Sequence, residues 1–539
     1  PRHLGIHNGG MVITGTPLAG RVPVEPATMP DRYVVQWDKE GLETAGLVKI
    51  DILGLRMLSL IAEAARTVEV RTGAAVDLSR LAFDDPAIYE LISRADTIGV
   101  FQVESRAQAQ MQPIFQPRRF EDLIVAISLI RPGPIQGDMV HPYLRRRLGE
   151  EPVTYAHPSL EAALGETLGV VLFQEQVLQV TRQMAGFSPG QGELLRRALG
   201  SKNAGEAIES FHEAFVQGAQ ARGVTRPVAE EVFDRLRAFA GYSFPKSHAA
   251  AFAVLVYQSA WLKVYHPAPF FAALLNHQPM GFWSPAVVVG DARRHGIRVL
   301  PVDIHRSEGV CMAVEDGLRL GFNYVKGLGE ASIARLADAR LAGPFTGLGD
   351  FCRRTRLPPR LVEHLILAGA FDGWDVPRRR LLWELGKLRY QADELELAFS
   401  DDGVQLLELS EVERFALERS LLGVSMDGHV MEYYRAWLDA RGVLSSAAVR
   451  ERQNGAPVRV AGLVVMHQAP PTAKGVHFVS LEDEHGLLDV IVWPDVYERT
   501  RRVLHGASLL LVEGVVQRRE SVMNVIAERV GMLDAPSGA

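Results

Sequence analysis

Apolar residues recur at intervals of three and four positions through most of residues 56–300. This spacing places them on one face of a helix and therefore predicts amphipathic helices. The clearest are expected at residues 56–72, 86–95, 120–130 and 250–265. Proline- and glycine-rich segments separate them, and no internal repeat is visible. The pattern favours one large helical domain.

Residues 453–539 follow a different pattern, because short apolar runs alternate with polar turns at near-regular spacing. Such runs predict the strands of a small β-barrel. A helix-like segment at 495–506 lies between the third and fourth strands, an order that resembles an OB-fold. OB-folds often bind single-stranded nucleic acid, although a barrel can also be a protein-interaction module. The candidate DNA-binding residues here are Lys474, His477, Phe478, Arg518 and Arg519.

Residues 318–343 contain a tight turn, Gly327-Leu328-Gly329, between two segments with short helical patterns. Backbone N–H groups of such a turn face outward at a helix N-terminus, where they suit a phosphate. The spacing resembles a helix-hairpin-helix, which binds the DNA backbone without reading its sequence. Lys326, Gly327 and Gly329 are its candidate DNA contacts. The alternative is an ordinary loop between helices, because a short glycine motif is weak evidence.

Residues 46–55, GLVKIDILGL, have the composition of a buried strand but carry two charges. On a strand, Lys49 and Asp51 project from one face, and Val48, Ile50 and Ile52 are expected to point into the opposite, packed side. A buried charge costs several kcal/mol unless it is paired or bound to a metal. The two residues are either an ion pair at a sheet edge or a metal-binding carboxylate beside a phosphate-binding lysine.

The composition is that of a soluble globular protein, and 539 residues are too many for one core. No apolar run is long enough to span a membrane. Two cysteines support neither a disulfide framework nor a cysteine-based zinc site, so a reducing, cytoplasmic setting fits. The chain starts at Pro1 without a signal-like segment, and we expect it to begin inside a larger protein.

The net charge of −6 argues at first against a nucleic-acid partner. Residues 391–420, however, hold nine acidic residues against two arginines, so the rest of the chain is close to neutral. Elsewhere the positive charge is clustered, at residues 145–147 and at Arg196, Arg197 and Lys202. Helical arginines often form only a solvated face, which is the alternative for each of them.

Several segments together resemble one family. They are HLGIHNGGMVI (3–13), GLVKIDILGL (46–55), GVFQVESR (99–106), LIRPGPIQGDMVHPYLRRR (129–147), VVLFQEQV (170–177), LLRRALG (194–200) and GYSFPKSHAAAFAVLVYQSAWLK (241–263). In this order they look like the bacterial C-family DNA polymerases, the DNA polymerase III alpha subunits. QGDMVHPYLRRR and Pro245 resemble the error-prone, damage-inducible branch, whereas Lys246 departs from that branch, in which glutamate is common.

The resemblance implies a multidomain α+β fold with part of a palm sheet, a large helical fingers domain, a helix-hairpin-helix region and a C-terminal OB-fold barrel. The expected boundaries are 1–55 for the palm part, 56–300 for the fingers, 301–375 for the helix-hairpin-helix region, 376–452 for an acidic helical connector and 453–539 for the OB-fold.

The resemblance also implies the metal chemistry. Three palm aspartates in this family hold two Mg²⁺ ions, which activate the primer oxygen and neutralise the leaving pyrophosphate. Asp51 matches the third aspartate, and Lys49 beside it would contact the triphosphate as a point charge. The family's other two lie in a PDxDxDF-like motif, and no such motif occurs in residues 1–539. The chain is expected to be a C-terminal portion that does not polymerise DNA alone.

For the incoming deoxynucleoside triphosphate, the resemblance implicates a further set of residues. They are Arg196, Arg197, Tyr242, Lys246, His248, Arg106 and Arg131. A structural capping role is an equal alternative for Arg106 and Arg131. His7 is expected to be a scaffold residue, because a metal-assisted reaction does not demand a histidine base.

The implied function is error-prone DNA synthesis on a primer–template. Residues 395–399, LELAF, faintly resemble a clamp-binding peptide, so a sliding clamp or a mutagenesis accessory protein is a candidate partner. The alternatives are a replicative alpha subunit and a non-catalytic DNA-binding or scaffold fragment.

Overall fold

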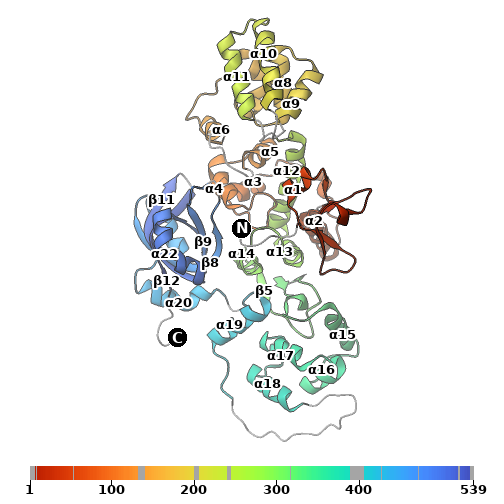
Figure 1. The fold of residues 1–539 in the computed structure, drawn as a ribbon. Coiled ribbons are helices and arrows are strands. Elements are labelled where there is room, and N and C mark those ends of the chain that lie inside the picture. Colours follow the sequence, from red (N-terminus) through yellow and green to blue (C-terminus); the bar gives the residue numbers. More distant parts are fainter. Residues whose placement is uncertain are drawn as a thin grey trace. The chain divides into compact units, whose positions relative to one another are not determined.

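The computed structural model describes residues 7, 9–52, 54–130, 140–199, 205–239, 244–315, 317–388, 406–426, 428–470, 473–519 and 522–533. The chain divides into two compact units, residues 1–59 and 60–539. Figure 1 draws both as a ribbon and labels those elements for which there is room. None of the helices in these residues is both long and apolar enough to cross a membrane.

The first unit contains two short antiparallel sheets. β1 (Gly10–Val12) pairs with β4 (Lys49–Asp51), and β2 (Val24–Pro26) pairs with β3 (Tyr33–Val35). A 3-10 turn, η1 (Leu18–Gly20), and a short helix, α1 (Lys39–Thr44), lie between these strands in the sequence. A small apolar core forms around Val22, Leu42 and Leu47.

The prediction that Val48, Ile50 and Ile52 face a packed side is wrong for this structure. All three side chains are exposed, from 43% for Ile50 to 70% for Val48. Within the described residues, β4 pairs only with β1, and the core of this unit forms around other residues. A two-stranded sheet has no second layer against which to bury an apolar face. The apolar residues of this segment therefore stay in contact with solvent.

The second unit begins with a long helical region. Its helices are α2 (Arg56–Thr72, which starts just before the unit), α3 (Pro86–Ser93), α4 (Arg106–Phe115), α5 (Phe120–Leu129), α6 (Val140–Arg147), α7 (Glu161–Leu164), α8 (Gln174–Ala185), α9 (Pro189–Leu199), α10 (Gly205–Gln220), α11 (Arg226–Ala238), α12 (Lys246–Tyr265), α13 (Pro267–Asn276) and α14 (Pro285–Arg294). Short 3-10 turns, η2 (Leu78–Arg80), η3 (Pro158–Leu160) and η4 (Gly165–Thr167), interrupt them. The helices predicted from apolar spacing are confirmed.

Two apolar cores hold this region together. One core packs α8, α10 and α11 around the buried rings of Phe215 and Phe233. The other packs α3, α5 and α12 around Tyr257, whose hydroxyl accepts a hydrogen bond from the Asp85 N–H. Of the nucleotide candidates, Arg196 and Arg197 lie on α9, and Lys246 and His248 lie on α12.

The next region starts with a small sheet in the order β5-β7-β6, formed by β5 (Arg298–Leu300), β6 (Met312–Val314) and β7 (Gly317–Arg319). Five further elements follow it: η5 (Phe322–Tyr324), α15 (Glu330–Arg340), α16 (Leu348–Thr355), α17 (Pro359–Leu367) and α18 (Arg378–Lys387), with a short turn, η6 (Asp372–Trp374), before the last. Of the two short helical patterns expected around Gly327, the first is only the 3-10 turn η5, which follows β7. The residues before η5 pair in the small sheet, which leaves little of the first segment helical.

The connector contains α19 (Glu411–Leu422), α20 (Val430–Asp439) and α21 (Ser446–Arg450). Much of the acidic segment, including residues 395–399, lies outside the described residues. Glu418 of α19 is buried and pairs with Arg378 of α18 at 3.0 Å. The part of the acidic segment that is described is thus anchored to the preceding region.

The C-terminal strands close into a barrel in the order β10-β12-β11-β8-β9 (Figure 1, blue). The strands are β8 (Pro457–Gln468), β9 (His477–Asp483), β10 (Gly486–Val492), β11 (Leu509–Arg519) and β12 (Val522–Met532). α22 (Pro494–Gly506) lies between the third and fourth strands. The predicted OB-fold is confirmed, including its helix.

Candidate functional site

Lys49 and Asp51 form an ion pair on one face of β4. The Lys49 Nζ atom lies 2.7 Å from the Asp51 Oδ1 atom, and about half of the Asp51 side chain is exposed. The hydrogen bond from Lys49 lowers the pKa of Asp51 below its usual value, and the positive charges nearby add to this effect. Asp51 is therefore an ionised, accessible oxygen donor of the kind that Mg²⁺ prefers.

His7 lies beside this pair, and the Lys49–Asp51 contact is kept. Its Nε2 atom is 3.8 Å from Asp51 Oδ1, and its Nδ1 atom accepts a hydrogen bond from the Gly9 N–H at 3.1 Å. Gly10 stands opposite Asp51 in the sheet, and a Cβ atom there would lie 3.0 Å from His7 Nδ1. A side chain at position 10 would crowd the pair. His7 thus contacts the backbone of the turn before β1, and its scaffold role stays a prediction.

Arg196 of α9 and Lys246 of α12 converge on the first turn of α8. The Arg196 Nη1 group donates to Gln174 Oε1 at 2.9 Å. The Lys246 backbone N–H donates to both carboxylate oxygens of Glu175, at 3.1 and 3.0 Å. The Lys246 Nζ atom lies 2.5 Å from Glu166 Oε2. Three of the motifs found in the sequence thus meet at one place.

The start of α8 is fixed by a buried amide. The Gln176 side chain accepts hydrogen bonds from the N–H groups of Leu172 and Phe173, at 2.8 and 2.9 Å. The Gln174 N–H then donates to the Phe244 carbonyl at 2.9 Å, which ties α8 to the segment that leads into α12. These hydrogen bonds fix the start of α8, on which Arg196 and Lys246 converge.

Glu193 is a member of this cluster that the sequence reasoning missed. Its carboxylate accepts two hydrogen bonds from Arg196, both at 2.8 Å, and one from Arg197 at 2.9 Å. These bonds, from Arg196 first and then Arg197, lower the pKa of Glu193 to about 2. The spacing of three and four residues along α9 makes the contacts possible, and this spacing is visible in the sequence.

The other nucleotide candidates are placed less completely. His248 is exposed near the start of α12 and packs between the rings of Phe244 and Phe252, with centroids 5.2 and 4.2 Å away. Tyr242 and Arg131 lie outside the described residues. Of the seven candidates, the structure brings together Arg196, Arg197 and Lys246, with His248 on the first turn of the same helix as Lys246.

Arg106 is buried against the barrel, and we leave it out of the nucleotide site. Its guanidinium carbon lies 4.6 Å from the centre of the Phe478 ring, and its Nε atom is 3.4 Å from Asp489 Oδ2. Both Nη atoms are buried without a hydrogen-bond partner among the described residues. Next to it, Gln110 of α4 donates to Asn524 of β12 at 2.9 Å. Arg106 therefore joins the helical region to the barrel.

The Gly327 turn leads directly into the N-terminus of α15. Gly327 has a φ of +86°, a conformation that other residues rarely adopt. Gly329 is the N-cap of α15, and its carbonyl accepts hydrogen bonds from the N–H groups of Ser332 and Ile333. Lys326 is exposed beside the turn, while Leu328 is buried beneath it. The turn thus presents a cation and a helix N-terminus to solvent.

Of the barrel candidates, one is exposed and three already contact other residues of the protein. Lys474 is exposed in the loop before β9. The His477 ring stacks on Tyr497, and its Nδ1 atom lies 2.8 Å from His467 Nε2. Phe478 is covered by Arg106, as described. The Arg518 guanidinium donates to the carbonyls of Arg450 and Arg452, and the Arg519 side chain is outside the described part of the chain.

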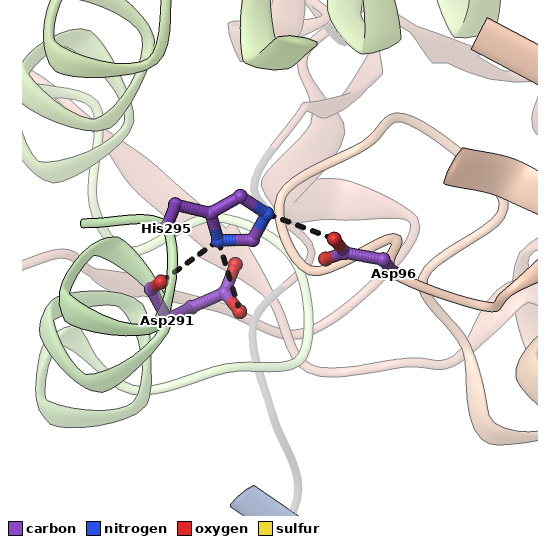
Figure 2. A group of neighbouring side chains, drawn as sticks. All are labelled: Asp96, Asp291 and His295. Carbon is purple, nitrogen blue, oxygen red and sulfur yellow. Dashed lines mark hydrogen bonds and ion pairs between the residues drawn. The ribbon is translucent and has the colours of Figure 1, made fainter. Parts of the chain in front are cut away.

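Asp96, Asp291 and His295 form the one cluster with the spacing of metal ligands among the described residues (Figure 2). An ammonium group already fills it. The fully buried Lys263 donates to Asp96 Oδ1 at 2.9 Å and to Asp291 Oδ2 at 2.8 Å. His295 Nε2 lies 2.8 Å from Asp96 Oδ2. The Lys263 ammonium therefore lies between the two carboxylates and compensates their charge, and we assign the cluster a structural role.

Four family models match the chain in order. They are the bacterial DNA polymerase III alpha NTPase domain at 1–54, the bacterial DNA polymerase III alpha subunit finger domain at 57–223, a helix-hairpin-helix motif at 296–381 and an OB-fold nucleic acid binding domain at 458–533.

Curated relatives named error-prone DNA polymerase match the chain over its whole length. The relative from Methylococcus capsulatus is 43% identical over 98% of this chain and 53% of its own length. Those from Mycobacterium tuberculosis and Corynebacterium efficiens are both 45% identical, over 100% and 98% of this chain and 50% and 49% of their own lengths. The chain spans about half the length of these relatives. It belongs to the C family of bacterial DNA polymerases, that of the DNA polymerase III alpha subunits, and within it to the error-prone group.

Proposed function

We propose that this chain is part of an error-prone DNA polymerase that adds deoxynucleotides to a primer by two-metal phosphoryl transfer. The observation that carries the proposal is the similarity to error-prone DNA polymerases along the whole chain. The fold agrees with it, because helical fingers, a helix-hairpin-helix motif and an OB-fold follow one another in the chain. The domain boundaries given from the sequence, from 1–55 to 453–539, remain part of the proposal.

Asp51 is the proposed metal ligand, and its environment fits Mg²⁺. Asp51 offers an ionised oxygen, and the positively charged ammonium of Lys49 already lies against that oxygen. When bound, the metal would polarise the reacting phosphate and lower the pKa of the primer hydroxyl. Lys49 would then turn from Asp51 to the triphosphate, where a compact ammonium can follow the charge that moves to the leaving group. Two ions require further carboxylates, which a PDxDxDF-like motif supplies in this family.

Arg196, Arg197, Lys246 and His248 are the proposed contacts to the incoming nucleotide, with Tyr242 and Arg131 as candidates from the sequence. Arg196 is held by Gln174 and Glu193, so its guanidinium plane is fixed before a ligand arrives. A planar guanidinium matches a phosphate with two parallel hydrogen bonds. Binding at this cluster orients the triphosphate, and orientation is a large part of catalysis in phosphoryl transfer.

DNA is the proposed macromolecular substrate. The exposed turn at Lys326, Gly327 and Gly329 suits a phosphate of the duplex backbone. Lys474 of the barrel is exposed and is the proposed contact to a single strand, together with Arg519. A sliding clamp or a mutagenesis accessory protein is also a proposed partner. This proposal rests on the sequence of the LELAF segment alone, which lies outside the described residues.

Replacing the metal ligand tests the proposal. In the complete gene product that contains these residues, Asp51→Asn should lower primer extension by roughly 100-fold or more, because the amide cannot replace an anionic ligand. Primer–template binding should stay unchanged. Asp31→Asn is the matched control, since Asp31 is exposed in a turn with positive φ, which asparagine tolerates. Extension by Asp51→Asn within about threefold of the parent would refute the assignment.

A further inference from the structure

We infer that Glu193 occupies the place of the nucleotide's phosphate in the free protein and sets how tightly the site binds a triphosphate. The inference rests on the proposed function, because it takes Arg196 and Arg197 as the phosphate contacts. It adds a role for a residue that is neither a metal ligand nor a phosphate contact: an internal anion that the substrate must displace.

The geometry of the Glu193 contacts is that of a bound phosphate. Arg196 presents its Nε and Nη2 groups to the two carboxylate oxygens at 2.8 Å each, the parallel pair that a guanidinium also forms with phosphate. Arg197 adds its Nε group to one of the same oxygens at 2.9 Å. A single carboxylate thus draws together two guanidinium groups that would otherwise repel each other.

The surroundings show why a substrate can displace Glu193. The Glu193 side chain is about one-third exposed and Arg197 is largely exposed, so both can move without breaking the core. Arg196 keeps a second partner, Gln174, which would hold it in place after the exchange. Lys246, the third cation of the cluster, is paired with Glu166 in the same way. Each cation of the proposed site therefore already carries an acidic partner.

The exchange has two consequences for binding. A triphosphate carries more negative charge than a carboxylate, so it can displace Glu193 from both Arg196 and Arg197. The ion pairs broken in the process weaken the observed affinity. Exposed helix pairs of this type change an equilibrium by about two- to threefold each. For two pairs we expect removal of the Glu193 charge to tighten triphosphate binding by about three- to tenfold.

Equilibrium titrations of the 539-residue chain with dATP and with inorganic tripolyphosphate test the inference. Glu193→Gln should tighten the binding of both probes by about three- to tenfold, and Arg196→Ala should weaken it. Glu193→Asp keeps the charge with a shorter reach and should fall between parent and Glu193→Gln. Glu213→Gln is the matched control, because Glu213 also pairs with an arginine, Arg226, but away from the cluster.

The outcomes separate this inference from the function on which it rests. Unchanged or weaker binding by both Glu193 variants, while Arg196→Ala loses affinity, would overturn the role of Glu193 and leave the nucleotide site standing. Unchanged binding by Arg196→Ala would overturn the site and the inference together. Equal tightening by Glu193→Gln and Glu213→Gln would show a general charge effect and would also overturn the inference.

Discussion

Replacing Lys263 by methionine should destabilise the helical region by about 3 kcal/mol or more. Lys263 is fully buried, and its ammonium donates to Asp96, to Asp291 and to the Ile98 carbonyl. Methionine fills a similar volume, so the packing loss is small and the loss of charge dominates. Asp291 is buried and would keep only His295 and Arg294, at 3.8 and 3.4 Å, as weaker partners.

The size of the effect follows from which charges remain. Removing one partner of a buried ion pair costs about 3–5 kcal/mol, because the other charge is left uncompensated. His295 and Arg294 offset part of that cost, so we expect the lower end of the range. A local loss of about 3 kcal/mol speeds amide hydrogen exchange by roughly 100-fold where opening is local. Hydrogen exchange measured on peptides from α12 and α14 reports this directly.

Two further variants make the test specific. Lys263→Met with Asp291→Asn should recover part of the stability, because the uncompensated charge is then gone. Lys474→Met, at an exposed lysine, should change exchange and stability little. A loss below about 1 kcal/mol in Lys263→Met, or no recovery in the double variant, would refute the reasoning that Lys263 neutralises this cluster.

Two other predictions concern substrates. Replacing Arg196 and Arg197 together by alanine in the complete gene product should raise the KM for deoxynucleotide much more than it changes duplex affinity, since phosphate contacts act in ground and transition states alike. Steady-state kinetics and a DNA titration check this, and a loss of DNA affinity at constant KM would move the pair to the template path. The 539-residue chain alone should bind primer–template with an affinity that falls steeply with salt, and should not extend the primer, because one carboxylate cannot organise two metal ions. Anisotropy titrations at two salt concentrations and a primer-extension assay measure the two properties. An affinity that does not change with salt, or extension of the primer, would contradict the prediction.

Local periodicity predicted the helices and the barrel, because both depend on residues close in the sequence. α2 was predicted with the bounds that the structure shows, since its apolar residues alone define a helical face. The same reasoning failed for Val48, Ile50 and Ile52, because apolar alternation says which face a strand could bury and not whether a second layer exists.

Those residues of the candidate site that belong to recognisable sequence motifs could be predicted. Arg196 and Lys246 were found through motifs, but the carboxylates that hold them were not. Glu193 lies within one helix of Arg196, and its spacing could have revealed the pair. Lys263 contacts Asp96 across 167 positions, which no local pattern encodes. The one signal in the sequence was a lysine near the end of α12, beyond a mostly apolar run.

The contact of Arg106 with Phe478 and Asp489 limits how this protein can be recombined with its relatives. OB-folds are often treated as interchangeable modules, yet here a helix of the preceding region places a buried cation on the barrel surface. A transplanted barrel without an aromatic ring at position 478 and an acid at 489 would leave that cation unpaired, at a cost of roughly 3–5 kcal/mol. We therefore expect a stable chimera to keep Arg106 together with an aromatic ring at 478 and an acid at 489, which is simplest when α4 and the barrel are exchanged together.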